Sequence, residues 1–185
     1  MRREKSRLST KDKVVGELKQ MDINLVEFKN ETETACALIK GFWKAHNGYE
    51  QPVEESLADL GEWTKEGHKF YFIVSDEKYA GFIHLGSRGC NVDWLEDILV
   101  LPEFQGRGIG SEAIRKAEEI VREYSESLYI EAAARNEKAI RLYQKLGYNC
   151  LNTITIRKDF CPENFETVRK ETMNGLEFEV KRYRG

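Results

Sequence analysis

The spacing of apolar side chains changes several times along the first third of the chain, and each change predicts an element. Residues 22–29 alternate apolar and polar side chains, which is typical of a half-buried strand. Residues 31–45 and 54–66 instead place apolar side chains three and four positions apart, which predicts two amphipathic helices, ended by Gly48 and Gly67. This part of the sequence therefore predicts one strand followed by two helices.

Strand patterns dominate the middle of the chain. Aromatic and β-branched runs at residues 70–74 and 80–85 are joined by the polar stretch 75–78, which predicts a hairpin. Residues 93–101 predict a further strand that stops at Pro102. The sequence thus predicts three successive strands here.

The second half begins with the clearest helical pattern in the sequence. Apolar side chains recur at three- and four-residue spacing through residues 109–124, so one face of this predicted helix is buried. Residues 128–134 predict a short strand. Asn136 is then expected to cap a helix that ends at Gly147.

The two ends of the chain complete the predicted organisation. Residues 153–157 and 176–182 predict a terminal pair of strands separated by a polar loop, and the polar residues 1–20 predict an N-terminal helical extension. Residues 21–185 then form one α/β domain, with antiparallel hairpins first and a parallel crossover later. The last two strands also offer a surface for pairing between two subunits.

Composition narrows the class of protein. The chain has 185 residues, enough for one domain with its own core, of which 41% are hydrophobic and 33% charged. Its 29 basic and 32 acidic residues give a formal charge of −3, which does not indicate a nucleic-acid partner. The basic start of the chain lacks the apolar run of a secretory signal, and the sequence contains no membrane-spanning stretch. We therefore expect a cytoplasmic protein that binds neither membranes nor nucleic acid.

Cysteines and histidines are too scattered to predict a metal site. No pair of cysteines has the close spacing of a zinc or redox motif, so free thiols are expected. The cysteines and histidines of the sequence are Cys36, Cys90, Cys150, Cys161, His46, His68 and His84.

A glycine-rich loop lies between the strand 93–101 and the helix 109–124. Gln105-Gly106-Arg107-Gly108-Ile109-Gly110-Ser111 has three glycines spaced by two. Glycines permit a tight turn, and the start of a helix presents unpaired N–H groups with a positive dipole. This combination predicts a pyrophosphate-binding site.

The glycine-rich loop has three other interpretations. Gly108, Gly110 and Ala113 match a dinucleotide-binding spacing, with Glu131 downstream as the ribose ligand. Five residues separate the strand from the first glycine, however, and the rest of the chain is too short for a doubly wound sheet. The Walker phosphate loop is excluded because Lys and Ser/Thr do not follow the glycines. A glycine-rich connection without a ligand is the remaining alternative.

Two motifs together resemble a known family. Gln105-x-x-Gly108-x-Gly110 follows 95–102, and Asn136-x-x-Ala139-x-x-Leu142-Tyr143 is followed by Leu146-Gly147-Tyr148. This order and separation, over residues 70–148, are similar to the GCN5-related N-acetyltransferase (GNAT) superfamily. The resemblance implies a mixed, mostly antiparallel α/β sheet with flanking helices and a V-shaped splay between the fourth and fifth strands.

The resemblance also implies acetyl-CoA as cofactor and a set of binding residues. Backbone groups at the splay would pair with the pantetheine arm, the loop amides would hold the pyrophosphate, and Tyr143 would lie near the sulfur. The implied cofactor-binding residues are Ile98, Leu99, Val100, Gln105, Gly106, Arg107, Gly108, Ile109, Gly110, Ser111, Asn136 and Tyr143.

Acetyl transfer to an amine needs a base, because only about one alkylamine in a thousand is uncharged at pH 7. Glu96 lies two positions before Ile98 and would share its face in a regular strand, so it is the first candidate, acting directly or through water. Asp97 would replace it if a bulge turned the strand. Tyr143 is the candidate proton donor to the leaving thiolate, and its alternative role is a core aromatic beside Ile140 and Leu146.

Aromatic and acidic side chains predict a site for a cationic small molecule. Local similarity of residues 95–97 and 110–112 to diamine acetyltransferases favours a small primary amine, such as a polyamine, aminoglycoside or amino-acid derivative. The alternatives are a protein N-terminus or lysine as acceptor, and a CoA-binding module without catalysis. The predicted acceptor-binding residues are Trp43, Tyr49, Trp94, Glu96 and Asp97.

Overall fold

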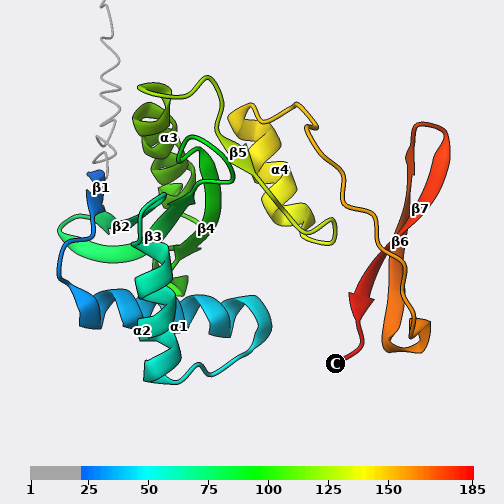
Figure 1. The fold of residues 1–185 in the computed structure, drawn as a ribbon, viewed down its shortest axis with the longest axis horizontal. Helices are drawn as coiled ribbons and strands as arrows, with labels where there is room; N and C mark the ends of the chain where they lie inside the picture. Colours follow the sequence, from blue (N-terminus) through cyan, green and yellow to red (C-terminus); the bar gives the residue numbers. More distant parts are fainter. Residues whose placement is uncertain (1–21) are drawn as a thin grey trace, which may run out of the picture.

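A five-stranded sheet forms the centre of the molecule (Figure 1). The computed structural model describes residues 22–185, so the extension predicted for residues 1–20 lies outside the described part of the chain. The strands lie in the order β1-β2-β3-β4-β5; β1 to β4 pair antiparallel, and β4 and β5 pair parallel. This arrangement confirms the predicted mixed, mostly antiparallel sheet. The strands are β1 (Ile23–Glu27), β2 (His68–Ser75), β3 (Lys78–Gly86), β4 (Trp94–Val100) and β5 (Tyr129–Ile130).

Helices cover both faces of this sheet. Side chains of β2 alternate between two cores: Phe70 and Phe72 pack under α1 and α2, whereas Tyr71 and Ile73 pack under α3. The period of two in the strand thus builds the three layers of the fold. Within residues 22–185, no helix combines the length and apolar character needed to cross a membrane. The helices are α1 (Thr32–Asn47), α2 (Val53–Trp63), α3 (Ile109–Arg122) and α4 (Glu137–Leu146).

Turn residues confirm most of the predicted boundaries. Gly48 ends α1 in the left-handed region at φ 76°. Helix α2 stops at Trp63, earlier than predicted, and Gly67 (φ 82°) instead lies in the turn before β2. The predicted β2–β3 hairpin is present, and its two central residues, Asp76 and Glu77, both have positive φ, as the tight hairpin turn requires.

Strand β4 contains a bulge at the position of the predicted base. In the β3–β4 pair, His84 lies opposite Asp97 and Leu85 lies opposite Leu95, so Glu96 is an extra residue. The strand is therefore not regular at this point. The expectation that Glu96 shares the face of Ile98 by simple alternation does not hold, because the bulge resets the alternation between them.

Strands β4 and β5 separate almost as soon as they meet. Only Trp94 and Leu95 of β4 pair with β5, through Tyr129 and Ile130. Among the described residues no strand pairs with this edge of β4 from Glu96 onward. The V-shaped splay between the fourth and fifth strands is thus present, and β5 is shorter than the predicted 128–134 because it loses its partner.

The C-terminal region corrects one prediction. Residues 151–159 form no helix or strand, so the strand predicted at 153–157 is wrong. The predicted strand 176–182 is present as β7 (Leu176–Tyr183), but its partner is β6 (Phe165–Met173), in the segment expected to be a polar loop. These two strands form a separate hairpin beside the central sheet (Figure 1). Cross-strand ion pairs, such as Lys170 Nζ to Glu177 Oε1 at 2.7 Å, supply the pairing that apolar alternation does not indicate.

Candidate active site

The glycine-rich loop connects the end of β4 to the start of α3 and is tied back to the strand. The Gln105 side chain donates a hydrogen bond from Nε2 to the carbonyl oxygen of Val100 at 2.8 Å. Gly106 and Gly108 have φ values of 75° and 82°, a region that disfavours side chains. The sequence therefore folds this segment into a tight turn that places the N-terminus of α3 beside the open edge of β4.

The start of α3 presents unpaired backbone donors. The first helical bond joins the N–H of Glu112 to the carbonyl of Gly108 at 3.1 Å. The N–H groups of Ile109, Gly110 and Ser111 precede it, so they have no acceptor within the helix. With the positive end of the helix dipole, these donors suit a phosphate group. The predicted turn and its free donors are therefore present, and their binding of a pyrophosphate stays a prediction.

The backbone of β4 offers a second set of groups at the splay. The N–H of Leu101 donates to the carbonyl of Ala80 at 2.8 Å, so Leu101 faces β3. Successive strand residues direct their polar groups to alternate edges, and therefore Ile98 and Val100 face the open edge. Leu99 does not: its backbone groups face β3 and its side chain is buried under α1 and α2. Leu99 is therefore removed from the predicted cofactor-binding set.

Helix α4 contributes two predicted residues from the other side of the splay. Asn136 caps the helix, with Oδ1 accepting a hydrogen bond from the N–H of Ala139 at 3.2 Å. Tyr143 packs against the core beneath α3 and meets the ring of Tyr148 edge to face. Burial raises the pKa of the Tyr143 hydroxyl above its ordinary value, so this group stays protonated at neutral pH.

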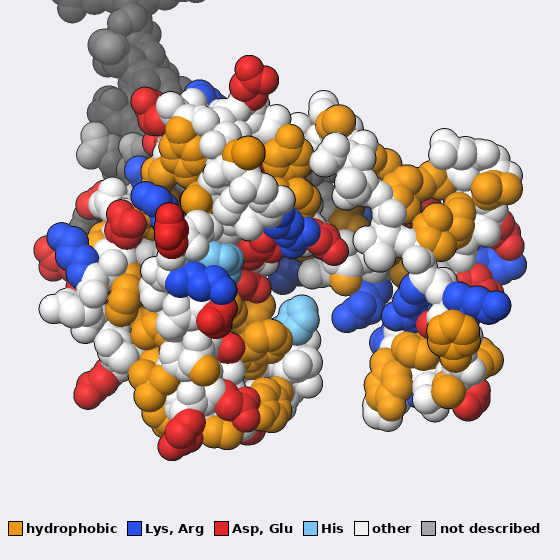
Figure 2. Space-filling model, in the orientation of Figure 1, with side chains coloured by type: hydrophobic (Ala, Val, Ile, Leu, Met, Phe, Trp, Pro, Cys, Tyr) orange, Lys and Arg blue, Asp and Glu red, His pale blue; other side chains and the backbone are white. Residues whose placement is uncertain are grey.

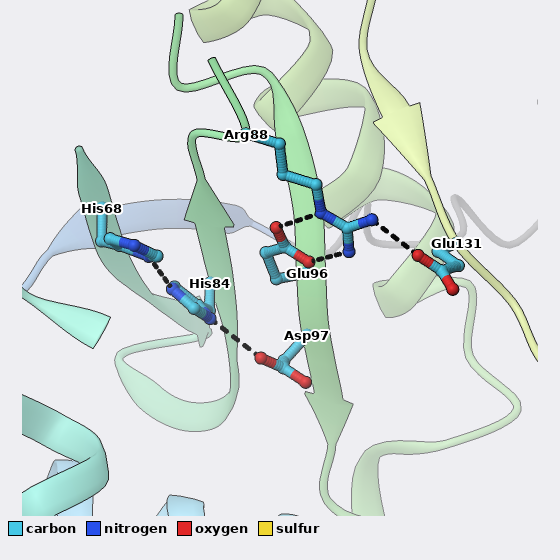
Figure 3. A network of polar contacts seen from close by, with 6 residues as sticks. All are labelled: His68, His84, Arg88, Glu96, Asp97 and Glu131. Atoms are coloured by element: carbon cyan, nitrogen blue, oxygen red, sulfur yellow. Dashed lines mark hydrogen bonds and ion pairs between the residues drawn. The ribbon is translucent and has the colours of Figure 1, made fainter. Parts of the chain in front are cut away.

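Arg88 joins the two sides of the splay through carboxylates (Figure 3). Its guanidinium donates to both oxygens of Glu96, at 2.9 and 2.6 Å, and to Glu131 just beyond β5 at 2.6 Å. It also lies 4.0 Å from the centre of the Trp94 ring. These hydrogen bonds raise the pKa of Arg88 further above its ordinary value. Two acids and an aromatic face thus surround one cation.

A second polar chain runs from Asp97 through two histidines (Figure 3). Asp97 Oδ2 lies 2.8 Å from His84 Nδ1, and His84 Nε2 lies 2.9 Å from His68 Nδ1. The His84 ring is buried and stacks on Trp63 with centroids 4.9 Å apart. Sequence spacing gave no reason to group these residues. The register of the β2–β3 hairpin brings the two histidines together, because His68 and His84 fall on the same face of adjacent strands.

Two predicted acceptor residues are engaged elsewhere. Trp43 donates from its indole N–H to Asp59 of α2 at 2.7 Å, and the Tyr49 hydroxyl donates to Glu55 of α2 at 2.8 Å. Both contacts hold α1 and its following loop against α2. The structure therefore brings Trp94, Glu96 and Asp97 together on β4 and gives Trp43 and Tyr49 a packing role in the α1–α2 layer.

A hollow separates the main body from the C-terminal hairpin (Figure 2). It has a volume of about 500 Å³, and basic side chains predominate on the hairpin side. Arg169 crosses to the start of α4, where it donates to Glu137 at 3.0 Å and to the carbonyl of Ala134 at 2.9 Å. The hollow is lined by His46, Ala133, Arg135, Asn136, Glu137, Val168, Arg169 and Arg182.

The region that contains the glycine-rich loop and α4 matches a known protein family. A family model described as Acetyltransferase (GNAT) family matches residues 35–148. The "Uncharacterized N-acetyltransferase YdgE" of Bacillus subtilis (strain 168) is 41% identical over 135 residues, covering 67% of this chain and 82% of that protein. "Thialysine N-epsilon-acetyltransferase" of Sus scrofa is 42% identical over 67 residues, covering 36% of this chain and 39% of that enzyme. The chain therefore spans about two fifths of the length of the thialysine enzyme.

Solved structures share the fold. Aminoglycoside N-acetyltransferase AAC(6')-Iy in complex with CoA superimposes with a TM-score of 0.58 at 18% sequence identity, covering 78% of this chain and 99% of that one. A putative acetyl transferase from Pyrococcus furiosus gives a TM-score of 0.57 at 22% identity, covering 75% of this chain and 100% of that one. At these identities the likeness establishes the fold alone.

Proposed function

Because the chain belongs to the GNAT family of acetyltransferases, we propose that this enzyme transfers an acetyl group from acetyl-CoA to a primary amine of a small molecule. The observation that carries the proposal is the position of Glu96 and Asp97. Both lie on β4 at the bulge, immediately before the open backbone edge at Ile98. Acidic groups beside the edge that would hold the acetyl donor suit a positively charged acceptor.

Several groups of the chain would hold acetyl-CoA. The free N–H groups of Ile109, Gly110 and Ser111 would bind its pyrophosphate, and the open-edge backbone groups of Ile98 would pair with the pantetheine arm. Asn136 would approach the same arm from α4. Acetyl-CoA supplies an acetyl group activated as a thioester. The backbone N–H groups at the open edge would polarise its carbonyl.

The acceptor amine would bind at the carboxylates of β4. Glu96 and Glu131 already hold the guanidinium of Arg88 over the Trp94 ring, which shows that this place accommodates a cation. The name of one relative describes acetylation of the ε-amine of thialysine, and the name of one fold neighbour describes acetylation of aminoglycosides. Both names describe amines that carry positive charge. A diamine or an amino-acid side-chain amine is thus the acceptor class that we propose.

Glu96 as the base and Tyr143 as the proton donor stay predictions. Both Glu96 oxygens accept hydrogen bonds from Arg88, so an incoming ammonium group must take over at least one of them. The half-buried Tyr143 keeps the proton of its hydroxyl at neutral pH and would donate it to the leaving sulfur.

An acetyl-CoA consumption assay tests the function. Full-length enzyme is incubated with acetyl-CoA and separate diamines, aminoglycosides, lysine, thialysine and short peptides, and free CoA is measured. We expect release with small cationic amines, and a loss of at least tenfold in kcat/KM when Glu96→Gln and Asp97→Asn are combined. Glu119→Gln, an exposed acid on α3, is the matched control. Turnover on peptides alone would contradict the small-molecule assignment, and CoA binding without turnover on any amine would contradict the enzymatic one.

A further inference from the structure

The hydrogen-bonded series Asp97–His84–His68 ends at the His68 ring, which has no part in any of the predicted roles. We propose that His68 is the catalytic base that takes the proton from the acceptor ammonium group, and that His84 and Asp97 are the positioning residues behind it. The inference rests on the proposed amine acetylation and deepens it by assigning the proton acceptor. It replaces Glu96 in that role and leaves Glu96 to bind the cation.

The geometry is that of a continuous hydrogen-bonded chain. Asp97 Oδ2 to His84 Nδ1 measures 2.8 Å, and His84 Nε2 to His68 Nδ1 measures 2.9 Å. The central ring, His84, is buried at 3% exposure and stacked on Trp63. A buried ring with both nitrogens engaged has a fixed orientation and no access to substrate. His84 therefore connects the two ends of the chain.

The hydrogen bonds also fix which nitrogen is available. An ionised carboxylate only accepts, so His84 donates to Asp97 from Nδ1 and its Nε2 accepts. His68 must then donate to His84 from Nδ1, which leaves a lone pair on His68 Nε2. The negative charge of Asp97 acts through His84 and stabilises the imidazolium that forms when His68 gains a proton.

His68 lies beside the carboxylate that would bind the amine. A Cβ atom placed on Gly86 would lie 3.2 Å from His68 Cε1 and 3.1 Å from Glu96 Oε1, so both side chains border the same point. The absence of a side chain at Gly86 makes this approach possible. An ammonium group held by Glu96 is thus within reach of His68 Nε2 directly or through one water.

The charged surroundings of His68 support a neutral resting ring. Burial is the main cause that lowers the pKa of His68, with further lowering by His84 and Lys65, while Glu96 and Glu62 act in the opposite direction. Arg88 faces Glu96 and offsets part of its charge. A ring that is neutral at pH 7 can accept a proton, whereas a ring already charged cannot.

The proposed step is a proton transfer that balances. The N–H bond of the ammonium group breaks, its electron pair stays on nitrogen, and the proton forms a new bond to His68 Nε2. The neutral amine then attacks the acetyl carbon and forms the C–N bond, and the C–S bond breaks with its electron pair leaving on sulfur. The nitrogen loses a second proton as the amide forms, and the leaving sulfur gains one, for which Tyr143 is the predicted donor. The imidazolium later returns its proton to water.

Kinetics across pH test the proposal in the full-length enzyme. With the best acceptor, we expect His68→Gln to lower kcat about a hundredfold at pH 7 and to remove the enzyme's acidic limb from the pH profile. Asp97→Asn should shift that limb to lower pH, because it removes the charge that favours the imidazolium. Imidazole should partly restore the activity of His68→Ala. The acceptor's own ionisation is common to all variants and cancels in the comparison.

Matched controls separate a chemical role from a structural one. Lys69→Gln changes the next residue of β2, whose side chain lies on the opposite face beside Glu27, and should keep both kcat and pH profile. CoA affinity and melting temperature should be unchanged in His68→Gln. The proposal is overturned if His68→Gln keeps the acidic limb, or if Glu96→Gln is the variant that removes it.

An NMR titration of the histidine rings decides the point without any acceptor. The hydrogen-bonded series Asp97–His84–His68 requires a proton on Nδ1 of His68. It also requires that the midpoint of the His68 ring titration shifts to lower pH in Asp97→Asn. A His68 ring that titrates identically in wild type and Asp97→Asn overturns the relay even if the enzyme acetylates amines. Conversely, absence of turnover on every amine with a responsive His68 ring would point to failure of the proposed function alone.

Discussion

Arg88 donates two parallel hydrogen bonds to Glu96, from Nε at 2.9 Å and from Nη2 at 2.6 Å. The same guanidinium reaches Glu131 across the splay between β4 and β5. A cation of the protein itself therefore occupies the carboxylates that would attract a cationic acceptor. Any acceptor amine that binds Glu96 has to compete with Arg88.

Removal of this internal competitor should strengthen acceptor binding. Arg88→Gln is expected to lower KM for a diamine by about two- to fivefold, since ion pairs at this exposure contribute roughly 0.5–1 kcal/mol. KM for acetyl-CoA should not change. Steady-state kinetics at low salt check this, with Arg122→Gln on the last turn of α3 as a charge-matched control. A raised acceptor KM would mean that Arg88 instead holds Glu96 in its binding position.

The bond from Gln105 to Val100 predicts a defect specific to the cofactor. Gln105→Ala should raise the Kd for CoA about three- to tenfold, because a hydrogen bond of roughly 0.5–1.5 kcal/mol that holds the loop is lost. The melting temperature should hardly change, because the bond is exposed. Calorimetric titration with CoA measures the effect. Gln144→Ala, on the exposed face of α4, controls for the loss of a glutamine side chain, and equal affinities in the two variants would contradict the tether.

The central sheet and the cofactor loop were predictable because local signals carry them. Alternation specified β1, and aromatic and β-branched runs specified β2 and β3. A period near 3.6 specified α3, and the glycines specified the turn before it. The side chains around Glu96 were not predictable, because they depend on register. The bulge at Glu96 changes which face each acid takes, and only the pairing of β2 with β3 brings His68 beside His84.

The C-terminal hairpin was missed for a different reason. Strand β6 carries few apolar residues, so periodicity does not indicate it, while residues 153–157 suggested a strand that is absent. A usable signal was present in Asn174-Gly175, whose φ values of 52° and 77° form the hairpin turn. Asn-Gly between two strands is the strongest short-range hairpin signal. This signal would have placed the partner of the strand 176–182 directly before residue 174.

Gly108 should be intolerant of any side chain for backbone reasons alone. A Cβ there meets no atom within 4 Å, yet φ is 82°. Gly108→Ala is expected to cost about 1–2 kcal/mol of folding free energy, the strain of an L-residue in the left-handed region, and to weaken CoA binding. Gly89→Ala is the matched control, because its Cβ also meets nothing and its φ is not in that region. Thermal unfolding with and without CoA compares the two, and equal losses would contradict a strained loop.

The predicted role of the Tyr143 hydroxyl as proton donor affects both kcat and its dependence on pH. If its hydroxyl protonates the leaving sulfur, Tyr143→Phe should lower kcat about ten- to a hundredfold and leave CoA affinity unchanged. Burial raises the pKa of Tyr143 above its ordinary value, so the donor form persists as pH rises. Any alkaline loss of rate due to Tyr143 must therefore begin above the pKa of about 10 of a free tyrosine.

The control for this prediction is its aromatic neighbour. Tyr148 packs against Tyr143 and donates its hydroxyl proton to Glu118 at 2.9 Å. Tyr148→Phe should therefore reduce the free energy of unfolding by about 0.5–1.5 kcal/mol through the loss of a part-buried hydrogen bond, with kcat preserved. Stopped-flow measurement of CoA release across pH separates the two variants. If both tyrosines can be replaced with the same small effect on kcat, then Tyr143 is a packing residue, and the leaving sulfur takes its proton from another group.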